Sequence, residues 1–191
     1  MPEGENAGAR VHVRRAGADD APVIAHLHVR GWQWAYRGLL PDAYLDGLSD
    51  DLPRRVEWWR SMLREESKWT WIAEMDGDSA GFADTFRSWD NDADAATAML
   101  GAIYLEQSAA RQGVGRALMT HAVCNLRERG FSTVTLWVLD TNTRARRFYE
   151  ALGWHTDGTT KTEQRPGFVV HEVRYRLSLG TEASTRETGG P

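Results

Sequence analysis

The stretch of this sequence with the clearest structural meaning is Arg111-Gln112-Gly113-Val114-Gly115-Arg116. An apolar run over residues 101–105 precedes it, and apolar residues at a spacing of four, a helical pattern, follow it. This order predicts a strand, a glycine-rich turn and the first turn of a helix. Free backbone N–H groups then gather at a helix N-terminus, where an anion binds. Glycine also allows a positive φ in the turn and close approach of a phosphate to the backbone.

Two common phosphate-binding motifs fit this stretch poorly. No Gly-Lys-Ser/Thr follows it, which excludes a nucleoside-triphosphate P-loop. Leu118 stands where a dinucleotide fingerprint needs its third glycine, and no βαβ unit opens the chain. A plain glycine-rich turn and a pyrophosphate site for another cofactor are the two interpretations that remain.

Length and composition predict one ordinary globular domain. The chain has 191 residues, enough to bury a proper core, with an apolar fraction of 41% and a charged fraction of 26%. A net charge of −4 gives no basic surface for nucleic acid. No apolar run reaches the roughly 20 residues that would span a bilayer, so no membrane association is expected.

Cysteine usage indicates a reducing compartment. Cys124 is the single cysteine, which excludes an internal disulfide. It falls between the core-facing positions of the helix after the glycine-rich stretch, which predicts a buried thiol without a catalytic role. Residues 1–9 are polar and lack the apolar segment of a signal peptide. We therefore expect a cytoplasmic protein.

Hydrophobic periodicity and turn residues divide the chain into helices and strands. Strands are predicted over residues 11–15, 69–75, 80–86, 97–105, 131–139, from 154 onward and over 168–177. Helices are predicted from Asp19 or Asp20 to Gly38, in a second region after Pro41, from Pro53, from 114 to 129 and from 142 to 153. Residues 88–95 are polar and rich in aspartate, which predicts a loop.

This order predicts an α/β domain with a mixed sheet. The strand, helix, strand unit over residues 97–139 needs a right-handed crossover, which makes its two strands parallel. The domain is expected over residues 10–178, after a disordered leader over residues 1–9 and before a disordered tail over residues 179–191.

A second motif lies at residues 142–154, Asn-Thr-Arg-Ala-Arg-Arg-Phe-Tyr-Glu-Ala-Leu-Gly-Trp. With the glycine-rich stretch one helix and one strand earlier, it makes residues 11–177 resemble the GNAT superfamily of acyl-CoA-dependent N-acyltransferases. Residues 34–41 are also typical of one group of such proteins. The resemblance implies an α+β arrangement with a mixed, largely antiparallel sheet, helices on both faces and a central parallel strand pair that splays apart.

The resemblance implies acetyl-CoA as co-substrate. It assigns the pyrophosphate to the amides of the glycine-rich stretch, which are those of Arg111, Gln112, Gly113, Val114, Gly115 and Arg116. It implies that the pantetheine arm pairs like an added strand with Ile103, Tyr104 and Leu105, one of whose amides can polarise the thioester carbonyl. Asn142 has two roles that can both hold, as a helix N-cap and as a coenzyme A contact.

The resemblance makes Tyr149 the catalytic residue, because the matching tyrosine donates a proton to the departing thiolate. Its place on the apolar stripe of a short helix also suits a core residue. Many family members carry a glutamate that acts as the general base. The positions where it would stand here, near Met99 and Trp137, hold no carboxylate. Glu106 is expected to cap a turn or to face solvent. Asp84 is a candidate base, with a solvated strand charge as the alternative.

Aromatic residues gather in the N-terminal helices, the part that borders the acceptor site in the family: Trp32, Trp34, Tyr36, Trp58 and Trp59. A site lined by aromatic residues suits an amine with an apolar or cationic portion. We predict acceptor contacts for Trp32, Tyr36 and Asp84. Core packing is the alternative, above all for Trp34 and Trp59. His26 and His28 lie on different helix faces and no histidine has metal-ligand spacing, so no metal is predicted.

The predicted function is transfer of an acetyl group from acetyl-CoA to an amine by direct attack in a ternary complex. A small-molecule amine is the expected acceptor. Two alternatives stay open: a non-catalytic acyl-CoA-binding sensor or interaction module, which the absence of a glutamate base favours, and a protein or peptide N-acetyltransferase. The sequence is compatible with a homodimer but does not specify the oligomeric state, the acyl chain or the acceptor.

Overall fold

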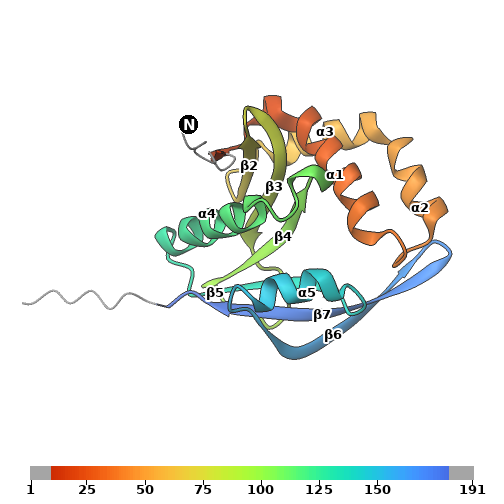
Figure 1. Cartoon of the computed structure of the whole chain (residues 1–191). Coiled ribbons are helices and arrows are strands. Elements are labelled where there is room, and N and C mark those ends of the chain that lie inside the picture. The colour runs from red at the N-terminus through yellow and green to blue at the C-terminus, as the bar shows by residue number, and fades with distance from the viewer. Residues whose placement is uncertain (1–9, 181–191) are drawn as a thin grey trace, which may run out of the picture.

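The computed structural model describes residues 10–180. Its seven-stranded sheet has the order β1-β2-β3-β4-β5-β7-β6, with helices on both faces (Figure 1). The strands are β1 (Val11–Arg15), β2 (Lys68–Met75), β3 (Asp78–Arg87), β4 (Thr97–Leu105), β5 (Thr133–Leu139), β6 (His155–Arg165) and β7 (Phe168–Ser178). The helices are α1 (Ala21–Tyr36), α2 (Asp42–Asp46), α3 (Leu52–Met62), α4 (Val114–Glu128) and α5 (Thr143–Glu150), with short 3-10 turns η1 (Ala18–Asp20), η2 (Gly47–Ser49) and η3 (Gln107–Ala109).

Side chains that point alternately to the two faces of β2 and β3 contribute to a separate core on each face of the sheet. Trp71 and Ala83 join the cluster under α4, whereas their neighbours Ile72 and Phe82 join the cluster under α1 and α3. Successive side chains of a strand point to opposite faces, so these helices cover opposite faces. Most residues of both strands are buried, and these include the polar residues Thr70, Asp84 and Thr85.

The predicted sheet is confirmed, including its one parallel pair. All neighbouring strands are antiparallel except β4 and β5. Those two pair only from Thr97 opposite Thr133 to Met99 opposite Thr135. Beyond these residues the strands separate, and β4 continues to Leu105 without β5 beside it.

A bulge bends β4 where the separation begins. Asp84 on β3 faces Ala102, but the next residue, Thr85, faces Leu100, so Gly101 is the extra residue. Glycine is required there because a Cβ would overlap the Phe86 ring. The bulge increases the local twist of the strand, which turns the rest of β4 away from β5.

The ends of several elements differ from the prediction by one to three residues. Helix α5 ends at Glu150 rather than Gly153, because a turn precedes the left-handed Gly153 at φ 84°. Strand β5 begins at Thr133 rather than residue 131. The predicted tail began at residue 179, but Leu179 is buried and its N–H donates to the Ser132 carbonyl over 2.8 Å. The predicted leader and residues 181–191 of the tail lie outside the described residues.

Helix α1 approaches β4 so closely that only glycine fits at one contact. A Cβ on Gly31 would lie 2.6 Å from the Tyr104 Cβ. Gly31 to alanine should therefore lower the free energy of unfolding by about 1–2 kcal/mol, although alanine is the better helix former. Urea denaturation of the two proteins measures this difference.

Gly47 provides the matched control. Its φ is −67° and the nearest atom to an added Cβ is 4.0 Å away, so Gly47→Ala should leave stability unchanged or slightly raised. Equal stability of Gly31→Ala and the wild type would contradict the close contact between α1 and β4.

Candidate active site

The glycine-rich stretch forms the predicted turn at the N-terminus of α4. Gly113 is the N-cap and has a φ of 86°, and Arg111 is also left-handed at 64°. The first helical bond runs from the Ala117 N–H to the Gly113 carbonyl over 2.9 Å. Among residues 10–180, no backbone carbonyl accepts from the N–H groups of residues 113–116. Such donors at the positive end of a helix are able to bind an anion.

Gly115 serves close packing rather than a special φ. A Cβ at this position would lie 3.3 Å from Leu105 Cδ1 and 3.4 Å from the Phe148 ring. The start of α4 therefore lies directly against the end of β4 and against α5. A larger side chain would push these elements apart.

The separated part of β4 leaves backbone groups without a strand partner on its β5 side. Ile103, Tyr104 and Leu105 pair with β3 on one edge, and no described strand pairs with the other. Only the turn η3 separates this open edge from the donors of α4. A ligand with an amide-bearing arm and an anionic end fits this continuous row of backbone groups.

Helix α5 positions the two residues of the second motif that have a predicted role, Asn142 and Tyr149. Asn142 is the N-cap, and its Oδ1 accepts from the Ala145 N–H over 3.1 Å, which confirms the predicted capping role. Tyr149 is 8% exposed and packs in the core cluster of α4. Burial raises the pKa of the Tyr149 phenol, so its hydroxyl stays protonated at neutral pH. A protonated phenol can donate, but it cannot act as a base.

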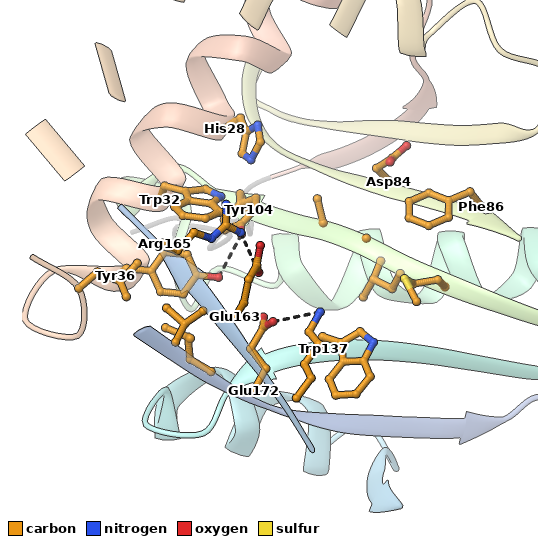
Figure 2. Close-up of a pocket in the computed structure, with 18 of the residues that line it drawn as sticks. His28, Trp32, Tyr36, Asp84, Phe86, Tyr104, Trp137, Glu163, Arg165 and Glu172 are labelled. Carbon is orange, nitrogen blue, oxygen red and sulfur yellow. Dashed lines mark hydrogen bonds and ion pairs between the residues drawn. The ribbon is translucent and has the colours of Figure 1, made fainter. Parts of the chain in front are cut away.

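A cavity of about 300 Å³ lies beside β4, between the N-terminal helices and the β6–β7 hairpin (Figure 2). The predicted acceptor residues Trp32, Tyr36 and Asp84 all line it, together with Trp58 and Trp59. The Tyr36 and Tyr104 hydroxyls form a hydrogen bond of 3.1 Å in its wall. Tyr104 thus presents its side chain to the cavity while its backbone belongs to the open edge of β4.

Asp84 is a buried carboxyl, not the solvated strand charge considered as the alternative. It is 5% exposed, and its Oδ1 accepts from the Thr70 hydroxyl over 2.7 Å. The described residues hold no ion-pair partner within 4 Å of it. Burial raises the pKa of Asp84 from 3.8 to about 6, so the carboxyl exchanges its proton near neutral pH.

His28 also lines the cavity and was not assigned a role from the sequence. Its Nδ1 accepts from the Trp59 indole N–H over 3.2 Å, which leaves the proton of the neutral ring on Nε2. Burial lowers the pKa of His28 to about 4. The spacing of four from His28 to Trp32 and Tyr36 was the available signal, since such residues share a helix face.

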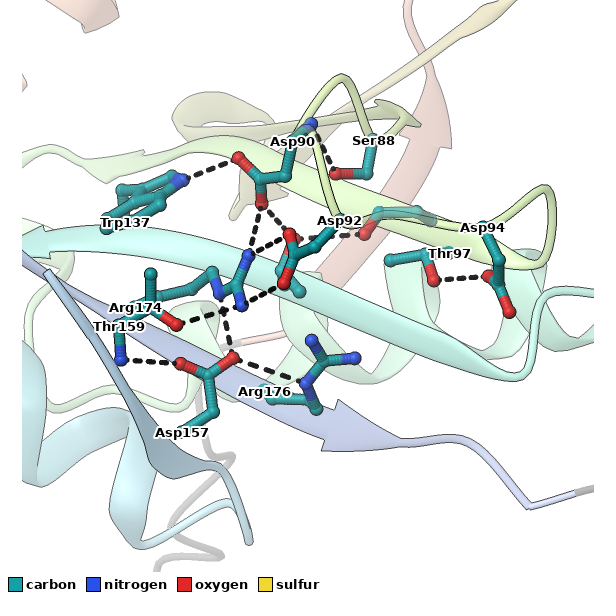
Figure 3. Close-up of polar contacts among 12 residues, drawn as sticks. Ser88, Asp90, Asp92, Asp94, Thr97, Trp137, Asp157, Thr159, Arg174 and Arg176 are labelled. Atoms are coloured by element: carbon teal, nitrogen blue, oxygen red, sulfur yellow. Dashed lines mark hydrogen bonds and ion pairs between the residues drawn. The ribbon is translucent and has the colours of Figure 1, made fainter. Parts of the chain in front are cut away.

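A buried arginine holds one wall of the cavity in place (Figure 3). Arg174 on β7 is 4% exposed and donates to both carboxylate oxygens of Asp92, over 2.6 and 2.7 Å, and to Asp157 over 2.7 Å. It also pairs with Asp90, whose other oxygen accepts from the Trp137 indole over 3.0 Å. The aspartate-rich loop is thereby fixed to β7, and Trp137 is oriented in the cavity wall.

Three other expectations are corrected. Cys124 is exposed, because it lies on the outer side of α4 rather than over the sheet. Trp34 is only partly buried and packs under the Arg144 guanidinium, 3.9 Å from its ring centre, instead of in a core. Glu106 occupies the N-cap position of η3, but its side chain makes no capping bond; it pairs with Arg30 over 3.1 Å, and this side chain is 18% exposed.

Within residues 10–180, no group of three or more histidine, cysteine or acidic side chains is arranged to hold a metal ion. No helix in this range is long and apolar enough to cross a membrane.

Comparison with known proteins points to one family. The Acetyltransferase (GNAT) family matches residues 30–154. A Mycobacterium tuberculosis protein named as a probable N-acetyltransferase is 28% identical over 173 residues, covering 88% of this chain and 94% of that protein. An uncharacterized N-acetyltransferase of Bacillus subtilis is 32% identical over 133 residues, covering 69% of this chain and 73% of that protein.

A solved structure shares the fold. The PaiA N-acetyltransferase of Thermoplasma acidophilum, crystallised with coenzyme A, superposes with a TM-score of 0.64 over 88% of this chain and 99% of that chain. Its sequence identity of 17% supports a common fold and no more.

The burial of Asp84 predicts a stability change that depends on pH. Because the folded-state pKa lies above the ordinary value, stability from this group is present below about pH 4 and is lost as the pH rises through about 6. Asp84→Asn removes the buried charge and keeps an acceptor for Thr70. It should raise the free energy of unfolding at pH 8 by up to about 3 kcal/mol, and by much less at pH 4.5.

Urea denaturation at the two pH values tests this. Asp78 is exposed on the same strand, so Asp78→Asn should change stability little at either pH. A gain for Asp84→Asn that is equal at pH 4.5 and pH 8 would show that burial does not penalise the Asp84 charge.

Proposed function

Because this chain belongs to the acetyltransferase (GNAT) family, we propose that it transfers the acetyl group of acetyl-CoA to an amine by direct attack in a ternary complex. Membership confirms the acyltransferase class predicted from the sequence. The finer proposal concerns the co-substrate, the mechanism and the residues that act, with a small-molecule amine as acceptor.

One observation supports the proposal most strongly. The open edge of β4 leads directly to the free N–H groups of α4, and the aromatic cavity lies beside the same strand. Two binding sites therefore adjoin one strand, as a ternary complex requires. The glycine-rich stretch and Asn142 would hold the pyrophosphate end of coenzyme A, and Ile103, Tyr104 and Leu105 would pair with its pantetheine arm.

Acetyl-CoA, when bound, supplies an acetyl group activated as a thioester. An amide of β4 would donate to the thioester oxygen, where negative charge develops as the amine attacks. The new C–N bond replaces the C–S bond, so one proton must leave the amine and one must reach the sulfur. Tyr149 would donate to the sulfur, because its phenol is protonated.

Asp84 is the proposed recipient of the amine proton. It lines the cavity beside the β4 bulge, and a pKa of about 6 leaves most of the carboxylate ionised at pH 7. A base with a pKa near the working pH accepts protons efficiently. This assignment supplies a general base in a chain that has no carboxylate at the family's glutamate positions. The alternative of a non-catalytic acyl-CoA sensor, which rested on the missing base, is thereby weakened.

Acetyl-CoA binding is the first test. Titration calorimetry should detect binding at submillimolar acetyl-CoA, and Gly115→Val should weaken it at least about tenfold. The valine would displace the start of α4 from Leu105 and Phe148 and so disturb the row of N–H donors.

Thr120→Val gives the control, because Thr120 is exposed further along the same helix. This variant should bind like the wild type, and thermal unfolding should show that both variants are folded. Absence of acetyl-CoA binding to the wild-type protein would refute the proposed function.

The role of Tyr149 is tested by removing one oxygen. Tyr149→Phe should lower kcat by about 100-fold in a thiol-release assay and leave the acetyl-CoA Kd unchanged. Tyr175→Phe is the control, because its hydroxyl is engaged with Glu150 and Arg146. An unchanged kcat for Tyr149→Phe would reduce Tyr149 to a core residue.

A further inference from the structure

We propose that the acceptor is a monoamine whose single amine is attached to a neutral aromatic or similarly flat apolar body. This inference rests on the proposed acetyl transfer and specifies its acceptor. It is carried by the way in which charges and rings are distributed around the aromatic cavity.

Only one carboxyl group of the cavity is free to meet a substrate amine. Glu163 pairs with Arg165 over 3.0 Å, and Glu172 pairs with Lys161 over 3.0 Å (Figure 2). Asp84 has the Thr70 hydroxyl as its hydrogen-bond partner and no cation within 4 Å among the described residues. The cavity therefore matches one basic nitrogen and offers no second free carboxylate.

Two rings of the cavity wall already carry protein cations. The Lys68 ammonium lies 4.1 Å from the centre of the Phe86 ring, and the Lys161 ammonium lies 4.5 Å from the centre of the Trp137 ring. A second substrate ammonium would have to displace these cations or lie beside them. Both arrangements are unfavourable because like charges repel strongly where water is excluded.

The other end of the cavity is largely aromatic, and its charged residues Arg165 and Glu163 pair with each other over 3.0 Å (Figure 2). Among the described residues, no cation lies over the rings of Trp32, Tyr36 or Tyr104. His28 is neutral there, because its Nδ1 accepts from Trp59 and its ring is enclosed by aromatic residues. Such a surface favours a neutral, flat group that can stack on the rings.

Contact between distant elements limits the length of the acceptor. Tyr44 on α2 meets Phe168 on β7 with ring centres 4.9 Å apart, where the hairpin reaches the N-terminal helices. A cavity of about 300 Å³ is at the small end of the range for ligand sites. It suits a single-ring amine better than a polyamine or a peptide chain.

A thiol-release assay with acetyl-CoA compares three acceptors at pH 8: 2-phenylethylamine, spermidine and a hexapeptide with a free N-terminus. We expect kcat/KM for 2-phenylethylamine to exceed that for the other two by at least about 100-fold. Trp32→Ala should raise KM for 2-phenylethylamine by more than about tenfold and leave the acetyl-CoA Kd unchanged. Trp34→Ala is the matched control, because Trp34 is on the same helix but does not line the cavity.

A gain of activity provides a second test, because a misfolded variant could not produce it. Lys161→Gln removes the cation nearer to Trp137, leaving the Arg174 guanidinium 5.7 Å from that ring centre, and it leaves Glu172 without its partner. We expect this variant to raise kcat/KM for 1,5-diaminopentane at least about tenfold relative to 2-phenylethylamine.

The outcomes separate this inference from the proposed function. Protein that fails to bind acetyl-CoA in calorimetry refutes the acetyl-transfer function itself. Protein that binds acetyl-CoA but prefers spermidine or the peptide overturns the monoamine assignment and keeps acetyl transfer. Binding of acetyl-CoA without turnover of any of the three amines also overturns the assignment.

Discussion

The structure depends on the short length over which β4 and β5 pair. Their parallel ladder covers three residue pairs, from Thr97 and Thr133 to Met99 and Thr135, and then opens. At the closed end, the Ala96 carbonyl accepts from Ser132 and Thr133, and the ion pairs of Arg174 fasten the loop before β4 to β7. These contacts hold the two halves of the sheet together, so the other end can remain open without loss of the fold.

The opening gives β4 two different surfaces. Its backbone edge is free on the β5 side and leads to the N–H groups of α4, whereas the Tyr104 side chain faces the aromatic cavity. The bulge at Gly101 supports both, because it bends the strand and brings Asp84 beside the cavity. Our proposal places acetyl-CoA along the first surface and the amine against the second, which brings the reacting groups to one strand.

Burial and pairing divide the charged groups near the cavity into two kinds. Arg174 pairs with Asp90, Asp92 and Asp157, and its guanidinium holds the pKa of Asp92 at about 2, so the Asp92 carboxyl stays ionised at neutral pH. Asp84 is buried without a cation, and His28 is buried against an indole donor, so burial raises the pKa of Asp84 to about 6 and lowers that of His28 to about 4. Ion pairing therefore produces a structural cluster in one place, whereas burial without an ion-pair partner produces a proton-exchanging group in another.

Local patterns in the sequence determined most of the elements, the parallel crossover, the left-handed turn at Gly113 and the N-cap at Asn142, because each depends on residues close together in the chain. Family resemblance added the roles expected of Tyr149 and the open strand. Tertiary structure alone decided that Asp84 is buried, that His28 and Trp32 share a cavity wall, that Cys124 is exposed and that Trp34 stacks on Arg144. Burial and charge pairing depend on which distant element covers a side chain, and periodicity within one helix or strand carries no record of that partner.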